Sequence, residues 1–108
     1  MLIKNNQYNS VLLVLYHTEN EKLKRIFKSS GLKKKDFNDM VINTMKKTFK
    51  NKSNYTFKYD LFEKIRTYRV PTYFNVDSNN FKIELSEKFK KSKTIILREL
   101  FCTYLENK

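Results

Sequence analysis

Lysines gather at two points of this sequence where the residue pattern predicts that a helix begins. The first cluster is Lys33-Lys34-Lys35, and the second is Lys91-Ser92-Lys93. The first turn of a helix leaves backbone N–H groups without partners and carries the positive end of the helix dipole, so lysines there are unfavourable unless an anion is bound. We therefore expect both clusters to bind phosphate groups. The alternative is that these lysines only solvate the start of a helix.

No arrangement of residues in the sequence indicates catalysis. The chain contains one histidine, His17, and one cysteine, Cys102, which is too few for a zinc site built from these residues. It has a single glycine, so a glycine-rich phosphate loop is not expected, and no nucleophile stands beside a plausible base. We expect no enzyme activity, no metal ion and no cofactor, with His17 structural or exposed and Cys102 in the core or in an interface.

The charge of the chain favours a polyanionic partner. Its 108 residues carry 23 basic against 11 acidic side chains, a formal net charge of +12. A field of this sign attracts DNA, RNA or an anionic surface. The alternative explanation is a lysine-rich composition inherited from a low-GC genome. The longest apolar run, residues 11–16, is far shorter than the roughly 20 residues of a membrane span, and the N-terminus has no signal-peptide core. We expect an intracellular protein that does not enter a membrane.

The first half of the chain predicts a strand followed by two helices. Residues 11–16 form a β-branched and aliphatic run typical of a strand. Thr18 and Glu21 have the spacing of a capping box that starts a helix over residues 19–30. Gly31 follows, where a left-handed residue ends a helix. Apolar residues at three-and-four spacing then predict a helix over residues 34–50.

The second half repeats this plan after a connection. Residues 51–69 are assigned to a linker with a short helix over residues 59–67, although residues 55–59 alternate like a strand. Pro71 excludes helix at the preceding residue, and residues 72–76 are predicted to form the second strand. Asp77 or Ser78 caps a helix ending near Lys90, and Ser92 caps the last helix. The chain is thus divided into two units, residues 1–50 and 70–108. Because glycine and proline, which interrupt helices, each occur once, we expect mostly helix.

The order of a strand, a helix, a tight turn and a second helix with a basic start resembles the ribbon-helix-helix family (MetJ/Arc type), here in tandem. The segment from Ser92 to Glu106 looks like the family's second helix, and Gly31 through Ile42 shows the same pattern in the first half. Tandem versions look similar in regulators of archaeal filamentous viruses and in plasmid transfer accessory proteins. The resemblance implies a mainly α fold with short β-ribbons, in two ribbon-helix-helix-like units.

In that family two strands pair antiparallel and the ribbon enters the DNA major groove. The resemblance implies that Phe74 and Val76 face the core and that Tyr73 and Asn75 face the bases, with Thr72 near the edge of the ribbon. Asparagine can pair with adenine, and tyrosine or threonine can touch a thymine methyl group, so an A·T-rich site is expected.

The same resemblance places phosphates at the two second-helix starts, namely at Lys33, Lys34 and Lys35 and at Lys91, Ser92 and Lys93. The first strand departs from the family pattern, because Leu12 and Val14 would face outward and cannot read base edges by hydrogen bonding. That strand is expected either to lie in a protein interface or to contact DNA through shape and phosphates.

These observations predict a double-stranded DNA-binding protein, most simply a transcriptional regulator such as a repressor, of viral or plasmid origin. We expect it to self-associate as a dimer or a larger assembly that spreads along DNA. One alternative is a protein-binding antitoxin or assembly module whose apolar first strand docks a partner. Another is an architectural protein that coats DNA without sequence preference.

Overall fold

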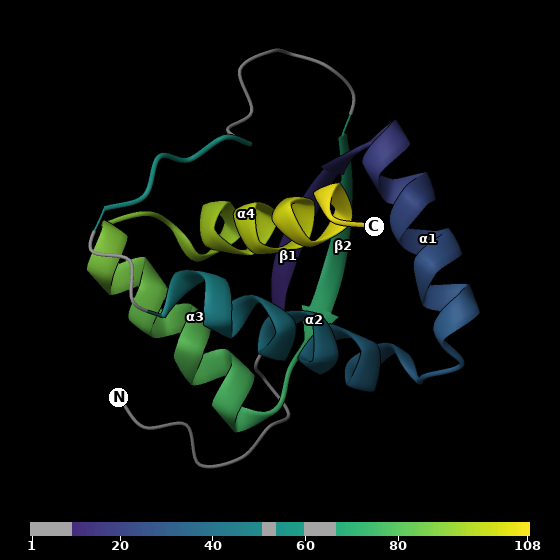
Figure 1. Cartoon of the computed structure of the whole chain (residues 1–108), viewed down its shortest axis with the longest axis horizontal. Coiled ribbons are helices and arrows are strands. Elements are labelled where there is room, and N and C mark those ends of the chain that lie inside the picture. Colours follow the sequence, from purple (N-terminus) through teal and green to yellow (C-terminus); the bar gives the residue numbers. More distant parts are fainter. Residues whose placement is uncertain (1–9, 51–53, 60–66) are drawn as a thin grey trace.

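The computed structural model describes residues 10–50, 54–59 and 67–108, and it is mainly helical with one two-stranded antiparallel sheet. The elements in chain order are β1 (Ser10–Tyr16), α1 (His17–Ser30), α2 (Lys34–Phe49), β2 (Thr67–Tyr73), α3 (Val76–Phe89) and α4 (Lys93–Glu106). In Figure 1 the two strands lie behind α2 and α4, while α1 and α3 lie on opposite sides of them. A strand and two helices thus occur twice, as the sequence predicts.

The two strands pair with each other inside one chain. Ser10 lies opposite Tyr73, Leu12 opposite Pro71, and Tyr16 opposite Thr67 in an antiparallel register. Each strand of a two-stranded sheet keeps one free edge. A proline whose nitrogen faces that edge, as Pro71 can, costs the sheet no hydrogen bond. The ribbon is therefore complete without a second chain.

An internal near-twofold symmetry relates the two halves. α1 begins at residue 17 and α3 at residue 76, while α2 begins at 34 and α4 at 93, so one separation of 59 residues relates both pairs. The same separation relates Leu12 to Pro71, which are paired in the ribbon. It also relates Gly31 to Lys90, and both have a left-handed backbone that ends a helix, with φ of 71° and 55°. The axis therefore passes between Leu12 and Pro71.

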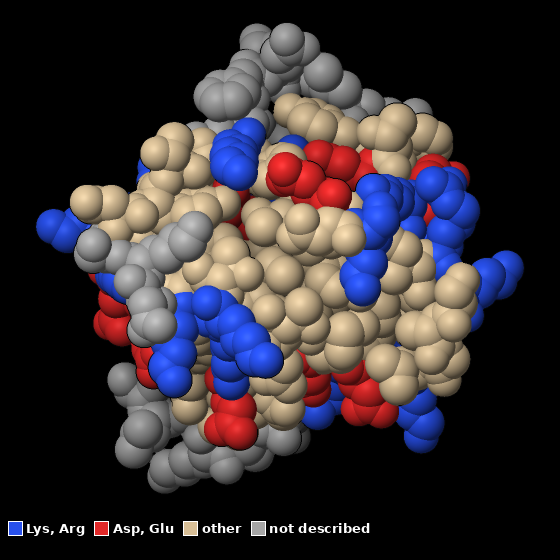
Figure 2. Space-filling model, viewed as in Figure 1, with Lys and Arg blue, Asp and Glu red and all other residues tan. Residues whose placement is uncertain are grey.

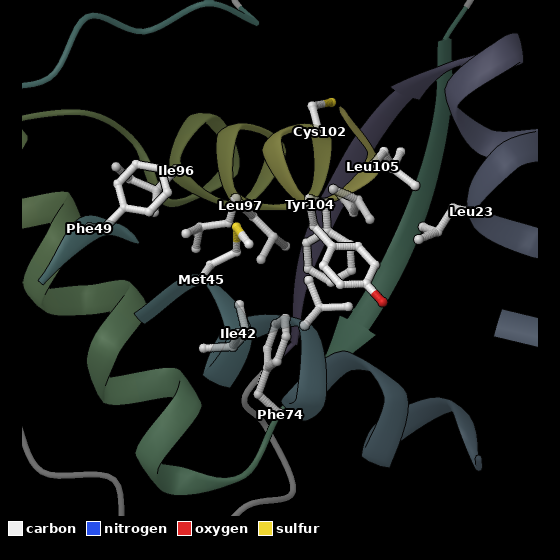
Figure 3. Packing of buried hydrophobic residues seen from close by; sticks show 14 of the residues in the cluster. Leu23, Ile42, Met45, Phe49, Phe74, Ile96, Leu97, Cys102, Tyr104 and Leu105 are labelled. Carbon is white, nitrogen blue, oxygen red and sulfur yellow. The ribbon is translucent and has the colours of Figure 1, made fainter. Parts of the chain in front are cut away.

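The core lies between the ribbon and the two central helices. The inner face of the ribbon presents Leu13 and Leu15, which are buried against these helices. Figure 3 shows side chains of α2, among them Ile42 and Met45, meeting Leu97 and Tyr104 of α4. Because each half buries its apolar surface on the other, the two halves share a single core.

Residues 54–59 cross from one half toward the other and are held by α4. They have no regular secondary structure, so the predicted helix over 59–67 is wrong at Tyr59 and at Thr67, which lies in β2; its residues 60–66 lie outside the described residues. The Glu99 carboxylate accepts hydrogen bonds from the Tyr55 hydroxyl and from the backbone N–H groups of Lys58 and Tyr59. Tyr55 is pressed against the Phe49 ring, with centroids 4.7 Å apart.

The second strand lies earlier in the chain than the predicted range 72–76. β2 spans Thr67–Tyr73 and includes Pro71, so the predicted boundary between residues 69 and 70 falls inside the strand. Phe74 is fully buried, as predicted, but it belongs to the turn that leads from β2 into α3. Proline is rare inside a strand, so the sequence predicts that Pro71 stands at the start of one; a two-stranded sheet has a free edge on each strand, where a proline costs no hydrogen bond.

The helix starts are capped by different residues from those predicted in two cases out of three. Tyr16 is the N-cap of α1, and its backbone N–H donates to the Glu19 carboxylate over 2.8 Å, so Thr18 and Glu21 do not form the capping box. Asn75 rather than Asp77 or Ser78 caps α3. Ser92 caps α4 as predicted, with its Oγ accepting from the Ile95 N–H over 3.2 Å.

In the part of the chain that the structure describes, no helix has the length and apolar character needed to cross a membrane.

Candidate nucleic-acid interface

The outer face of the ribbon is formed by alternate residues of both strands. On β2 the exposed residues of this face are Arg69, Pro71 and Tyr73, with Tyr73 retaining 49% of its surface, while Thr67 at the start of the strand is half-buried. On β1 the corresponding face contains Leu12, which is 41% exposed, and Val14, which is only 8% exposed. Because side chains alternate along a strand, this face points away from the core.

Thr72 lies on the inner face of the ribbon and not at its edge. It is 1% exposed, and its hydroxyl donates a hydrogen bond of 2.7 Å to the backbone carbonyl of Val11. That bond ties the two strands together. Of the three residues predicted to read bases, Thr72 therefore does not share a surface with Tyr73.

Asn75 lies beyond the end of β2, where it acts as the N-cap of α3. Its side-chain Oδ1 accepts a hydrogen bond of 2.8 Å from the Ser78 N–H, and its own N–H donates to Asp39 over 3.0 Å. The oxygen that would pair with adenine is thus already engaged. Only Tyr73, of the three predicted residues, belongs to the outer face of the ribbon.

Arg69 is the residue that the sequence interpretation missed. It is exposed on β2, directly opposite Val14. Arginine can donate two hydrogen bonds to the O6 and N7 atoms of guanine, the commonest specific contact to a base in the major groove. The signal that could have found it is the alternation of Tyr68, Val70 and Thr72, which places Arg69 on the opposite face.

The first lysine cluster lies at the start of α2, as predicted. Lys33 is its N-cap and is exposed. The Lys35 ammonium is 3.8 Å from an Asp39 carboxylate oxygen, and the Lys34 ammonium lies 4.8 Å from the centre of the Phe27 ring. Partial burial lowers the pKa of Lys34 below its usual value. The cluster thus presents Lys33 most openly, with Lys34 and Lys35 held beside the helix start.

The second cluster lies at the start of α4, at the position equivalent to the first. Ser92 is the N-cap, Lys93 is exposed, and the Lys91 ammonium is 5.3 Å from the centre of the Phe57 ring. Lys93 corresponds to Lys34 of the other half through the separation of 59 residues. Two lysine-rich helix starts are therefore related by the same axis that passes through the ribbon.

Two sets of partly buried contacts fix the ribbon against the helices. The Arg98 guanidinium on α4 donates to Glu19 on α1, over 2.7 and 3.1 Å, and to the Val14 carbonyl on β1 over 3.0 Å. The residue equivalent to Arg98 is Asp39 on α2, which accepts from the N–H of Asn75. In each half, the junction of strand and helix is thus held by the second helix of the other half.

Charged side chains are unevenly distributed over the molecular surface. Figure 2 shows the face formed by the helices, from which the ribbon is hidden; its centre is uncharged and its basic side chains lie toward the periphery.

Among residues 10–50, 54–59 and 67–108, no group of three or more histidine, cysteine, aspartate or glutamate side chains is arranged to hold a metal ion. Comparison with protein-family models, with curated proteins and with solved structures gave no match.

Proposed function

We propose that this protein binds double-stranded DNA by inserting the outer face of its ribbon into the major groove, and that it acts as a transcriptional regulator. The observation that carries the proposal is the pairing of β1 and β2 into a ribbon with exposed Arg69 and Tyr73, in a chain whose two second helices have lysine-rich starts. A two-stranded ribbon has the width that the major groove of B-DNA admits. The arrangement resembles the ribbon-helix-helix family.

The helix starts supply the sequence-independent part of the binding. Each presents free backbone N–H groups and the positive end of a helix dipole, with Lys33 at α2 and Lys93 at α4 exposed beside them. Neutralised phosphates release counterions, so affinity falls steeply as salt rises. The net charge of +12 adds long-range attraction to the same partner.

The sequence preference that we propose differs from the A·T-rich site expected from the sequence alone. Asn75 caps α3, which removes the residue on which the preference for adenine depended. Arg69 takes its place on the outer face and favours guanine. Tyr73 keeps the capacity to touch a thymine methyl group.

Binding to a protein partner is the second candidate function, because the outer face of the ribbon also exposes apolar surface. Leu12 is 41% exposed and lies opposite Pro71, and neither can donate a hydrogen bond to a base from its side chain. A partner strand or helix could bury this surface. A second copy of the chain could bury the same apolar surface, so self-association into larger assemblies stays a prediction.

The test of the proposal is a duplex-binding titration over a range of salt concentrations. The double variant Lys33→Gln/Lys93→Gln removes one charge from each helix start. Each phosphate contact contributes about 0.9 to the slope of log affinity against log salt, so the variant should lower the slope by about two. The matched control is Lys24→Gln/Lys108→Gln, which removes two charges elsewhere and should leave the slope nearly unchanged. If the helix-start variant and the control variant change the salt slope equally, or if the wild-type chain does not bind duplex at low salt, the proposal is overturned.

A further inference from the structure

The ribbon's outer face carries different side chains on the two sides of the axis that relates the halves. The register places Arg69 opposite Val14 on one side of the axis and Tyr73 opposite Ser10 on the other, with the pair Thr67 and Tyr16 beyond Arg69. The separation of 59 residues makes Arg69 equivalent to Ser10, and Tyr73 equivalent to Val14. In a symmetric dimer these two pairs would be identical. Here one side carries an exposed arginine and the other an exposed tyrosine.

The difference extends to how open the two equivalent positions are. Tyr73 keeps 49% of its surface exposed, while Val14 keeps 8%. Leu12 and Pro71 lie on the axis, and neither side chain can hydrogen-bond to a base edge. The exposed polar side chains of β2, Arg69 and Tyr73, thus lie on opposite sides of the axis, and neither is repeated by its equivalent position on β1.

The helix starts differ less than the two sides of the ribbon. Both carry a lysine at the first helical position, Lys34 on α2 and Lys93 on α4, although Lys33 corresponds to Ser92. Each start can hold a phosphate on one flank of a site, which positions the protein without reading the sequence. The choice of orientation on DNA therefore depends mainly on the ribbon.

We propose that the chain recognises a non-palindromic duplex site and binds it in one orientation, with a guanine at the end contacted by Arg69. This inference rests on the proposed function. Tyr73 lies four positions after Arg69, or about 13 Å along a strand, which matches the rise of about four base pairs. The preferred site is therefore a guanine at one end and a different base, contacted by Tyr73, about four steps away.

Selection of bound duplexes from a randomised pool measures the symmetry of the site. The wild-type chain should select a consensus without dyad symmetry. Arg69→Ala should lose the guanine preference and bind the selected site about 10-fold to 100-fold more weakly, in the range of one bidentate base contact. Arg25→Ala, which removes an exposed arginine from α1, is the matched control and should retain the consensus. A palindromic consensus in the wild-type chain would overturn the inference.

Tethered cleavage measures the orientation on the selected duplex. Ser29 and Lys88 are equivalent exposed positions in the last turns of α1 and α3. Iron-EDTA attached to Ser29→Cys should cut one flank of the site, and the same reagent on Lys88→Cys should cut the other flank. Cys102 is buried, and burial raises the pKa of its thiol, so the wild-type chain serves as the unlabelled control.

The outcomes separate this inference from the proposed function. Cleavage of one flank by each variant supports binding in a single orientation. Cleavage of both flanks by each variant, with tight binding retained, would overturn the orientation but leave DNA binding standing. Failure of the wild-type chain to bind any duplex at low salt would overturn both.

Discussion

Lys82 is a buried lysine at a position where the other half of the molecule has a leucine. It is 2% exposed, and its ammonium lies 5.6 Å from the centre of the Phe74 ring. Its equivalent through the separation of 59 residues is Leu23, which belongs to the core. Burial, helped by the charge of Lys93, lowers the pKa of Lys82 to about 8. The charged form is therefore destabilised at neutral pH.

Replacing Lys82 with methionine should stabilise the fold at pH 7 by about 1 to 3 kcal/mol, because it removes a buried charge and keeps a similar volume. Between pH 8 and 10.5 the unfolded chain binds a proton that the folded chain has released, so the stability of the wild-type chain should rise with pH relative to Lys82→Met. Denaturant unfolding of both chains at several pH values measures this. The exposed Lys88→Met is the control; if it gains as much, burial of Lys82 is not the cause.

The ion pair between Arg98 and Glu19 is a second residue-level feature with a consequence for stability. Burial acts to raise the pKa of Glu19, but hydrogen bonds from Arg98 and from the Tyr16 N–H outweigh it, so the pKa lies below its ordinary value of 4.5. A carboxyl group with a lowered folded pKa stabilises the fold above its ordinary pKa and loses that contribution as pH falls through the folded value.

Glu19→Gln should therefore destabilise the chain at pH 7 by about 1.5 to 3 kcal/mol, the range for hydrogen bonds to a charged group, because the pair is only partly buried. The difference from wild type should shrink as pH falls below 4.5, which unfolding titrations at pH 7 and in acid can measure. Glu21→Gln is the matched control, since its nearest cation, Lys24, lies 3.9 Å away at the surface. A pH-independent difference would show that the charge of Glu19 does not act through this pair.

At the scale of elements, the two tight turns between helices show how one backbone shape is built from different residues. Gly31 and Lys90 both adopt left-handed backbone conformations after α1 and α3. A Cβ added to Gly31 would meet no described heavy atom within 4 Å, so any cost of substitution there is conformational. Lysine at position 90 carries that conformational cost already.

Lys90→Gly should raise the stability of the chain by about 0.5 kcal/mol, the difference between relief of the left-handed conformation and the extra freedom of glycine when unfolded. Gly31→Ala should lower it by about 1 kcal/mol. Thermal or chemical unfolding of the two variants beside wild type measures both signs. A loss of stability in Lys90→Gly would contradict this account of the turn.

The elements that sequence alone predicted are those specified by local signals. The start of α2 after Lys33, the end of α1 at Gly31 and the cap of α4 at Ser92 all follow from residues within one turn of helix. The position of β2 could not be predicted in this way. Its residues depend on pairing with β1, and the free edge of the ribbon permits Pro71 where local rules disfavour it.

The candidate site was predicted in full only where it depends on helix starts. Both lysine clusters lie where the sequence placed them, because helix boundaries are local. The two faces of the second strand were predicted correctly, since Tyr73 is exposed and Phe74 is buried. The strand begins and ends earlier than predicted, so Asn75 lies beyond its end as a helix cap, and Arg69 lies within it on the outer face. Thr72 is buried because it lies on the same face as Val70 and Phe74.

At the scale of the whole molecule, the ribbon and both helix starts belong to one chain. The Cα radius of gyration is 13.4 Å, close to the value of about 13 Å expected for a compact domain of this length. β1 and β2 are far apart in sequence and pair only when both halves are together. The surface proposed to contact DNA is therefore a property of the complete fold and of neither half alone.

The most direct test of this surface is an NMR titration of the intact, isotopically labelled chain with a short duplex at low salt, following every backbone amide. DNA binding through the ribbon predicts the largest shifts at Arg69 and Tyr73 and at the first turns of α2 and α4, with little change at Lys24 on α1. Shifts concentrated on α1 and on residues 54–59, or no shifts at all, would contradict the account.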